Sequence, residues 1–240
     1  MPDIDLTGLA EGRGGSQSLR GFLARPPGSG LSPGVVLIHE VFGINDVMRR
    51  SAERLAAAGY LTLAVDLFSD GGTLRCLVSS MRALRSGRGQ AFTDIETARQ
   101  WLLDSPQCTG RVGVIGFCMG GGFALLTADS GFEAASVNYA PFSGDLKEAI
   151  VGACPIVGSY GGSDRSLKGA APRLEAALTK AGIVHDVKEY PGAGHAFLND
   201  AESGPRVLRP LLRVAGIRPE PVAAADAWRR IEDFFAAHLR

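Results

Sequence analysis

The sequence predicts an α/β fold, in which a mostly parallel central sheet carries helices on both faces. Short apolar runs alternate with amphipathic helical segments along the whole chain, which is the pattern of repeated strand–helix–strand units. The run Val35 to Ile38 is continuously apolar, as expected of a central parallel strand that is buried on both faces. A short strand, a glycine-rich turn and an apolar helix follow one another at 111–128 and add another such unit.

The first half of the chain supplies the edge and the centre of this sheet. We expect a helix at 47–58, because Gly59 can take the left-handed conformation that ends many helices. A second helix is expected at 94–103, before Pro106. Residues 67–90 are irregular or helical. The other expected elements are an edge strand at 19–24, a turn at 26–30, and strands at 35–38, 61–65 and 112–115.

The second half repeats the alternation. A helix over 174–181 ends at Gly182, and an amphipathic helix at 223–238 closes the chain. Residues 200–222 contain four prolines, and we expect them to form a surface excursion before that last helix. The other expected elements are a helix over about 119–128 and strands at 135–139, 154–159 and 184–189.

Composition limits the classes to which this protein can belong. Its 240 residues are enough for a sizeable core, so we expect a single α/β domain over 1–240. Lys plus Arg and Asp plus Glu number 25 each, which favours neither nucleic acid nor a membrane as a partner. There is no signal-peptide pattern and no apolar stretch of the roughly 18 residues that a membrane helix needs. The four cysteines are not closely paired, which favours reduced thiols and a cytoplasmic location.

The run Gly116-Phe117-Cys118-Met119-Gly120 is the most informative motif. It has the form of a nucleophile elbow, with cysteine where serine is more common. The sharp turn strains the backbone of the nucleophile, and neighbours without a Cβ leave room for it. Cys118 would lie at a helix N-terminus, whose partial positive charge favours a thiolate. A glycine-rich turn around a small buried cysteine is the alternative interpretation.

Such a nucleophile needs a base, and the base needs an acid that orients it. Asp164, His195 and Glu40 each follow an expected strand, where functional residues of open α/β sheets collect. The order nucleophile, acid, histidine is that of the α/β-hydrolase fold. Asp66 is the alternative acid, although it precedes the nucleophile in the chain. Asp164 could instead cap the helix near Leu167, and Glu40 could be a solvated loop carboxylate.

These residues make the chain resemble the dienelactone hydrolase family of α/β-hydrolases over most of its length. The matching segments are 39–43, 64–68, 116–121, 161–164 and 194–197. A cysteine elbow with a downstream aspartate and a Gly-His-x-Phe sequence is fairly specific to that family. The resemblance implies the α/β-hydrolase fold and a catalytic triad of Cys118, His195 and Asp164. It also implies that Glu40 contacts the thiol and helps to control its ionisation.

The resemblance implies further contacts around the triad. The backbone amides of Met119 and Val41 would form an oxyanion hole, which agrees with the general logic of the fold. Phe42, Phe197 and Asn199 would lie at the substrate-binding site.

The sequence departs from the family where its characterised members hold the carboxylate of the substrate. They carry one arginine shortly after the strand that ends at Phe68 and another four residues after the histidine. Here those places read Ser69-Asp70 and Asn199. Three nearby arginines could take the place of the family's arginines: Arg75, Arg82 and Arg85. The sequence does not show where their side chains point.

The sequence therefore predicts a hydrolase of carboxylic-ester or lactone bonds, similar to carboxymethylenebutenolidases, that acts on a small uncharged substrate as a monomer or homodimer. No organic cofactor is implied, and no Cys/His cluster has the spacing of a metal site. One alternative is a thiol sensor, which would need a second cysteine to resolve the first. Cys154 is the candidate, but it begins its expected strand and so belongs at the opposite end of the sheet. The other alternative is a ligand-binding relative without turnover.

Overall fold

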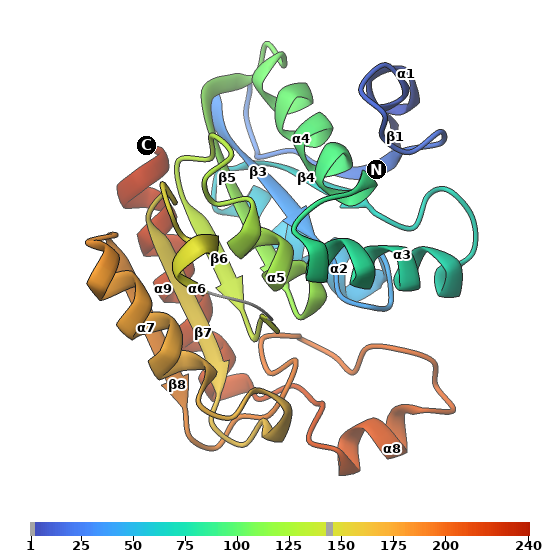
Figure 1. The fold of residues 1–240 in the computed structure, drawn as a ribbon. Coiled ribbons are helices and arrows are strands. Elements are labelled where there is room, and N and C mark those ends of the chain that lie inside the picture. Colours follow the sequence, from blue (N-terminus) through green and yellow to red (C-terminus); the bar gives the residue numbers. More distant parts are fainter. Residues whose placement is uncertain (1–2, 143–145) are drawn as a thin grey trace.

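The computed structural model describes residues 3–142 and 146–240, which contain one eight-stranded sheet (Figure 1). The strand order is β1-β2-β4-β3-β5-β6-β7-β8. β1 pairs antiparallel with β2, β2 pairs antiparallel with β4, and the remaining neighbours are parallel, so the expected mostly parallel sheet is confirmed. The strands are β1 (Asp3–Asp5), β2 (Arg20–Ala24), β3 (Ser32–Ile38), β4 (Leu61–Asp66), β5 (Cys108–Phe117), β6 (Ala135–Asn138), β7 (Ile156–Gly161) and β8 (His185–Tyr190).

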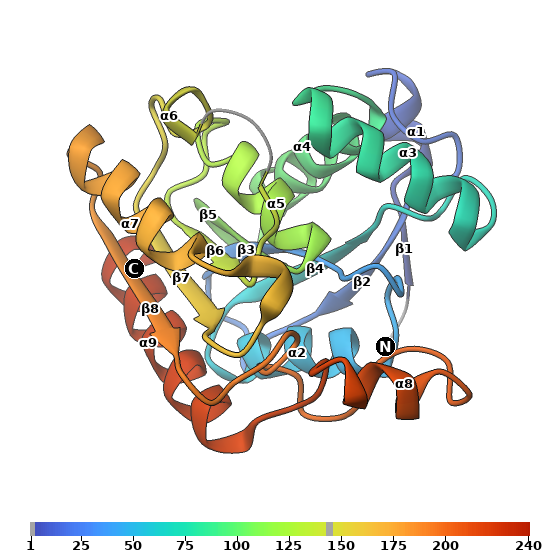
Figure 2. The same ribbon diagram turned by 60° about the horizontal axis from the view of Figure 1, so that its bottom comes forward.

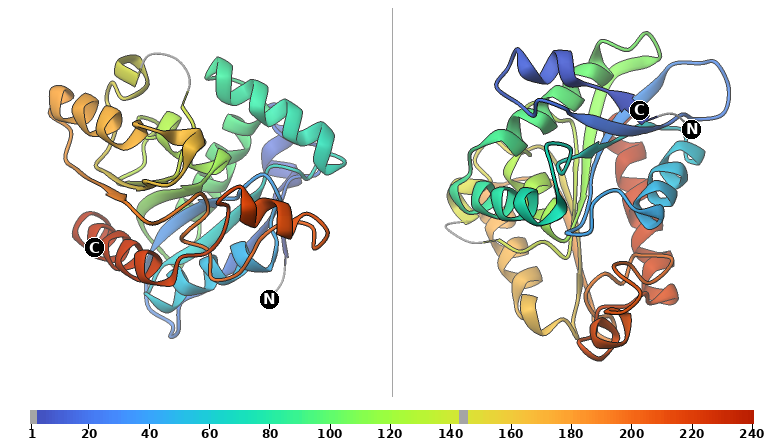
Figure 3. Two further views of the ribbon diagram at one scale, coloured as in Figure 1. Left: turned by 90° about the horizontal axis from the view of Figure 1, so that it is seen from below. Right: turned by 90° about the vertical axis from the view of Figure 1, so that its right-hand side faces the viewer.

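Helices cover both faces of the sheet, which is seen edge-on in the right-hand view of Figure 3. One face carries α2 (Asp46–Ala57) and α9 (Pro221–Leu239). The other carries α3 (Thr73–Ser86), α4 (Gln90–Leu103), α5 (Met119–Leu126) and α7 (Ala170–Ala181). Short helices complete the fold: α1 (Thr7–Glu11), α6 (Leu146–Ala149), α8 (Arg209–Val214) and a 3₁₀ turn at Arg165–Leu167.

The central strand shows why its sequence is apolar throughout. Side chains of a strand alternate between the two faces of the sheet. Val36 and Ile38 of β3 pack beneath α3, α4 and α5, whereas Val35 and Leu37 pack beneath α2 and α9. All four are fully buried, so β3 has no solvated face on which a polar residue would be favourable.

Two helices lie in segments for which the sequence predicts no definite helix. The region 67–90, expected to be irregular or helical, contains the helix α3, and the expected surface excursion 200–222 contains the helix α8. Leu74 and Val78 of α3 are exposed, as are Leu211 and Val214 of α8. Apolar residues on the solvent side blur the amphipathic period by which a helix is predicted from sequence. No helix in the described ranges combines the length and apolarity needed to cross a membrane.

The carboxyl ends of the parallel strands lie at one edge of the sheet, at the bottom of Figure 1. The excursion after β8 crosses this edge, and Figure 2, which turns the edge forward, shows α8 on the outside near α2. This edge holds the residues singled out by the sequence.

Candidate active site

Strand register brings the candidate residues together. Ile38 of β3 lies opposite Gly116 of β5, so the segments that contain Glu40 and Cys118 leave the sheet side by side. Phe117 lies opposite Asn138 of β6, and the amide of Cys118 donates to the Asn138 carbonyl at 3.1 Å. Because parallel strands end at a common edge, residues distant in the chain form one site.

The turn at Cys118 has the geometry of an elbow. Cys118 has φ 54° and ψ −119° and stands directly before α5. A Cβ on Gly116 would lie 1.9 Å from the carbonyl oxygen of Gly120, and a Cβ on Gly120 would lie 2.2 Å from that of Ile38. No other residue fits at either glycine without moving the backbone, which explains the spacing of the motif.

Backbone strain is concentrated around this turn. Within the described residues, the non-glycine residues with positive φ are Cys118 at 54°, Tyr139 at 35° and Ala196 at 60°. They lie at the end of β5, directly after β6 and next to His195. Each such conformation costs on the order of 1–3 kcal/mol and persists only where the surrounding structure enforces it. Clustered strain of this kind is typical of functional sites.

His195 is paired with Asp164. Nδ1 of His195 lies 2.6 Å from Oδ2 of Asp164, which is almost completely buried. The other carboxylate oxygen of Asp164 accepts hydrogen bonds from the amide and hydroxyl of Ser166, so it also caps the 3₁₀ turn that begins at Arg165. Burial alone would raise the pKa of the Asp164 carboxyl, but hydrogen bonds from His195 and Ser166 hold it below its usual value.

His195 also interacts with the thiol. Burial alone would lower the pKa of His195, but its hydrogen bonds to Asp164 and Cys118 raise that pKa to about 10. The imidazole of His195 is therefore protonated at neutral pH, and it lies between the carboxylate of Asp164 and Cys118.

Asp66, the alternative acid, belongs to a different cluster. Its Oδ1 accepts from the amide of Phe68 and lies 3.6 Å from Nε2 of His39. That nitrogen accepts from the amide of Leu67 at 3.1 Å, so Nδ1 of His39 carries the proton and donates to the Glu40 carbonyl at 2.6 Å. His39 therefore ties the ends of β3 and β4 together, and Asp66 is not the partner of His195.

Glu40 is buried in a cage of neutral donors. Its Oε1 accepts from the hydroxyl of Tyr139 at 3.1 Å and from Nδ2 of Asn199 at 3.1 Å. Its Oε2 accepts from the hydroxyl of Ser203 at 2.9 Å and from Asn199 at 3.3 Å. No lysine or arginine of the described residues forms an ion pair with this carboxylate. The interpretation of Glu40 as a solvated loop carboxylate is wrong, because it is 3% exposed.

Tyr139 connects the two halves of the site, and sequence reasoning missed it. Its ring meets that of His195 edge-on at 5.0 Å, while its hydroxyl reaches Glu40. Burial, then the nearby charges of Glu40 and Cys118, raise the pKa of Tyr139 well above its usual value, so it remains a donor. The sequence placed it within a strand at 135–139, but β6 ends at Asn138. The sequence feature that could have identified Tyr139 is its position directly after a strand, at the edge of the sheet where the other candidate residues lie.

The expected oxyanion donors lie on either side of the elbow. Met119 is the first residue of α5, and Val41 follows Glu40 in the loop after β3. In the described part of the chain, neither backbone amide donates a hydrogen bond to a backbone acceptor outside its own helix or strand. The role of these two amides as oxyanion donors stays a prediction.

The residues expected to contact substrate have different environments. Phe42 is half-buried and its ring lies against Gly204 of the excursion. Phe197 is completely buried, with its ring packed against those of Tyr139 and Tyr190, so its position favours a role in the core rather than at a substrate pocket. Asn199 is also buried, and its side chain holds Glu40.

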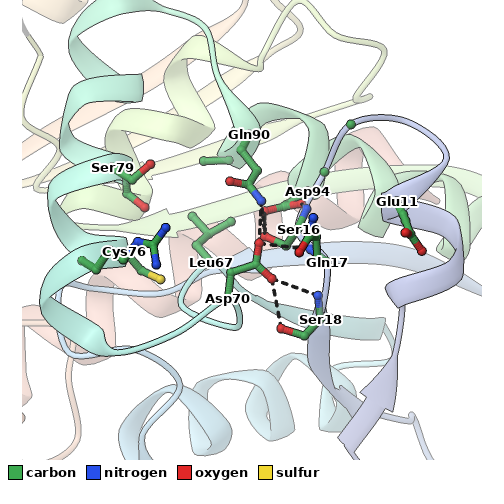
Figure 4. A pocket seen from close by; sticks show the side chains of 15 residues that line it. Glu11, Ser16, Gln17, Ser18, Leu67, Asp70, Cys76, Ser79, Gln90 and Asp94 are labelled. Carbon is green, nitrogen blue, oxygen red and sulfur yellow. Dashed lines mark hydrogen bonds between the residues drawn. The ribbon is translucent and has the colours of Figure 1, made fainter.

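The positions that hold arginines in the family have structural roles here. Asp70 accepts hydrogen bonds from the amides of Gln17 and Ser18 and from the side chain of Gln90, so it fixes the segment before β2 (Figure 4). Arg75 lines the cavity of about 890 Å³ shown in that figure, together with Asp70. Arg82 and Arg85 are exposed. No contact brings any of these three arginines to Glu40 or His195 within the described residues.

The site contains no group of metal ligands. Among the described residues, no cluster of three or more histidine, cysteine or acidic side chains could hold a metal ion. The geometry instead brings together a cysteine, a histidine and an aspartate, with a second buried carboxylate beside them.

Comparison with known proteins gives the same relatives from sequence and from structure. The model of the dienelactone hydrolase family matches residues 19–239. A protein of Methylorubrum extorquens, provisionally named a carboxymethylenebutenolidase, is 29% identical over 89% of this chain and 75% of its own length. A protein of Synechocystis with the same provisional name is 29% identical over 92% of this chain and 93% of its own length.

Solved structures share the fold. A structure titled m3DLH superposes with a TM-score of 0.79 and 26% identity, covering 95% of each chain. A dienelactone hydrolase-like promiscuous phosphotriesterase from metagenomic libraries gives a TM-score of 0.81 at 21% identity, covering 100% of this chain and 98% of its own. The second similarity concerns the fold alone, and both agree with the expected α/β-hydrolase architecture.

Proposed function

Since this chain belongs to the dienelactone hydrolase family, we propose that it hydrolyses carboxylic-ester or lactone bonds with Cys118 as the nucleophile. The observation that carries this proposal is the chain of contacts from Asp164 through His195 to Cys118 at a strained strand-to-helix turn. A nucleophile, a base within reach and an acid that orients the base are the parts of a catalytic triad.

The proposed mechanism begins with attack of the Cys118 thiolate on the carbonyl carbon of the substrate. The resulting oxyanion is held by the backbone amides of Met119 and Val41, and each such donor contributes about 3 kcal/mol in comparable sites. The imidazolium of His195 protonates the leaving alkoxide, and an acyl-thioester on Cys118 remains. Asp164 keeps Nδ1 of His195 protonated and holds the ring in position.

The second half-reaction returns the enzyme to its starting state. After the alcohol leaves, His195 is neutral and accepts a proton from water, which attacks the thioester carbon. Collapse of the second tetrahedral intermediate releases the acid and restores the thiolate and the imidazolium. The protons lost and gained by His195 balance over the cycle.

We propose an uncharged substrate because of the cage around Glu40. A carboxylate of a substrate placed here would meet an existing negative charge balanced only by neutral donors. An unpaired buried charge costs several kcal/mol. Neutral esters and lactones avoid this cost.

The test is the time course of p-nitrophenol release from p-nitrophenyl acetate. A hydrolase gives a burst followed by steady turnover, whereas a thiol sensor stops after at most one equivalent. Cys118→Ala should abolish both phases. Release that stops at one equivalent would contradict the proposal and favour a sensor. The position of Cys154 speaks against a sensor, because it precedes β7 at the opposite end of the sheet and burial raises its pKa to about 12.

A further inference from the structure

The excursion after β8 contains a basic, apolar segment at 205–218. Its charged residues are Arg206, Arg209, Arg213 and Arg218, with no aspartate or glutamate among them. Arg213 pairs with Glu202, which lies just before the segment, and Arg209 donates to the Gly204 carbonyl. On its surface, Val207 is 86% exposed, Leu211 68% and Val214 88%. Val207 lies in the turn before α8, and Leu211 and Val214 belong to α8 itself. Exposed apolar side chains of this size, gathered on one short element, mark a surface that contacts something else.

The inner side of the same segment is attached to the candidate active site. Ile217 forms a β-bridge with His195, and the amide of Arg218 donates to the His195 carbonyl at 3.1 Å. Just before the segment, Ser203 donates to Glu40 and Gly204 lies against Phe42. A partner that docks on the outer side is therefore held beside the carboxyl edge of the sheet, where α8 lies on the outside of the molecule near α2 (Figure 2).

The charge of the segment selects among possible occupants. A second copy of this chain, docked through the same patch about a twofold axis, would place the arginines of both copies against each other, with only the charge of Arg213 offset by its ion pair with Glu202 among the described residues. A protein partner of high affinity is contacted mainly through aromatic, methionine and arginine side chains. The 205–218 segment has no aromatic residue and no methionine. Aliphatic side chains flanked by arginines suit an anionic lipid surface, which needs no matching shape.

We propose that the outer face of the 205–218 segment docks on an anionic lipid surface and that the site hydrolyses neutral esters present there. The docking is argued from the surface of the 205–218 segment and does not depend on the proposed function. The choice of substrate rests on the proposed function. The balanced total charge of the chain does not bear on this surface, because the four arginines are concentrated in one segment. Peripheral docking of this kind requires no membrane-spanning helix.

The experiment is co-sedimentation with vesicles of phosphatidylcholine, with and without phosphatidylglycerol, using the whole protein. We expect binding only when phosphatidylglycerol is present, and weaker binding as ionic strength rises. Val207→Glu and Val214→Glu together should reduce the bound fraction about tenfold or more. Val184→Glu is the matched control, because Val184 is 58% exposed and precedes β8 at the opposite end of the sheet.

Each outcome decides the proposal. Equal binding to both vesicle types, no binding to either, or an equal loss in the Val184→Glu variant would overturn it. Dimerisation that Val207→Glu abolishes would show that a second copy is the occupant. Cys118→Ala should bind vesicles like the wild type, so that failure of docking and failure of catalysis are observed separately. The Val207→Glu and Val214→Glu variant should turn over p-nitrophenyl acetate normally in the absence of vesicles.

Discussion

Asp164 and Glu40 are both buried carboxylates at the same edge of the sheet, yet their partners differ. Asp164 faces a histidine whose pKa is raised to about 10, so it is balanced by a cation whenever His195 is protonated. Glu40 receives hydrogen bonds from a phenol, an amide and a hydroxyl, and no histidine, lysine or arginine of the described residues forms an ion pair with it. The comparison teaches that the partners of a carboxylate, rather than its burial, set its role. We infer that Asp164 orients a base and that Glu40 determines which charges can enter.

The pairing of His195 with Asp164 also makes the stability of the fold depend on pH. The pKa of His195 is raised from 6.5 to about 10 on folding, so its contribution to stability is complete below 6.5 and disappears as pH rises through about 10. The pKa of Asp164 is lowered from 3.8, so its contribution is complete above 3.8 and disappears as pH falls through the lowered value. The pair therefore stabilises the fold most between about pH 3.8 and pH 6.5, where both contributions are complete.

The largest expected effect is on the carboxylate that orients the base. Asp164→Asn should lower kcat for p-nitrophenyl acetate by about four orders of magnitude, because the imidazole loses the acceptor that fixes its tautomer. Asp66→Asn is the matched control, since Asp66 lies near His39 and should leave kcat within a fewfold of the wild type. A large loss in Asp66→Asn with normal turnover in Asp164→Asn would reverse the assignment.

A smaller effect is expected when charge is added to the substrate. We expect kcat/KM for a carboxylated lactone to be at least about tenfold below that of its methyl ester, because its carboxylate would be buried beside that of Glu40, which no lysine or arginine of the described residues pairs. Asn199→Arg places a guanidinium where Asn199 now contacts Glu40, and it should narrow this gap. A tenfold preference of the wild type for the anion would rule out a neutral substrate.

The smallest effect is expected for the charge of Glu40 itself. Tyr139 is influenced electrostatically by both Glu40 and Cys118, so the carboxylate and the thiol act on the same small region. Glu40→Gln removes a negative charge that opposes the thiolate, and the pH profile of alkylation by iodoacetamide should move to lower pH. Ser203→Ala keeps the charge and serves as the control. If the profile of Glu40→Gln does not move, the two groups do not interact.

The sequence was sufficient to predict the positions of residues that follow strands in recognisable motifs. Cys118 could be placed at the elbow because Gly116 and Gly120 tolerate no side chain, and that steric demand is visible in the spacing. The parallel sheet could be predicted because β3, buried on both faces, must be apolar throughout. The alternation of apolar and amphipathic segments was enough for most of the remaining order.

The contacts of Glu40 could not be predicted, because they depend on how irregular segments fold back. Ser203 lies in the excursion, and nothing in its local sequence indicates that it meets Glu40. Phe197 was expected at the substrate-binding site. The chain turns at Ala196, with φ 60°, and the side chain of Phe197 is buried in the core. Side-chain direction after a strained residue is a tertiary property that no period in the sequence encodes.

The most direct test of the central claim is to identify the acylated residue during turnover. The enzyme is mixed with p-nitrophenyl acetate, quenched in acid during the steady state, and digested for peptide mass spectrometry. We expect one acetyl group, on the peptide that contains Cys118, and none on that peptide from Cys118→Ala. An acetyl group on another residue, together with undiminished turnover in Cys118→Ala, would contradict the assignment of Cys118 as the nucleophile.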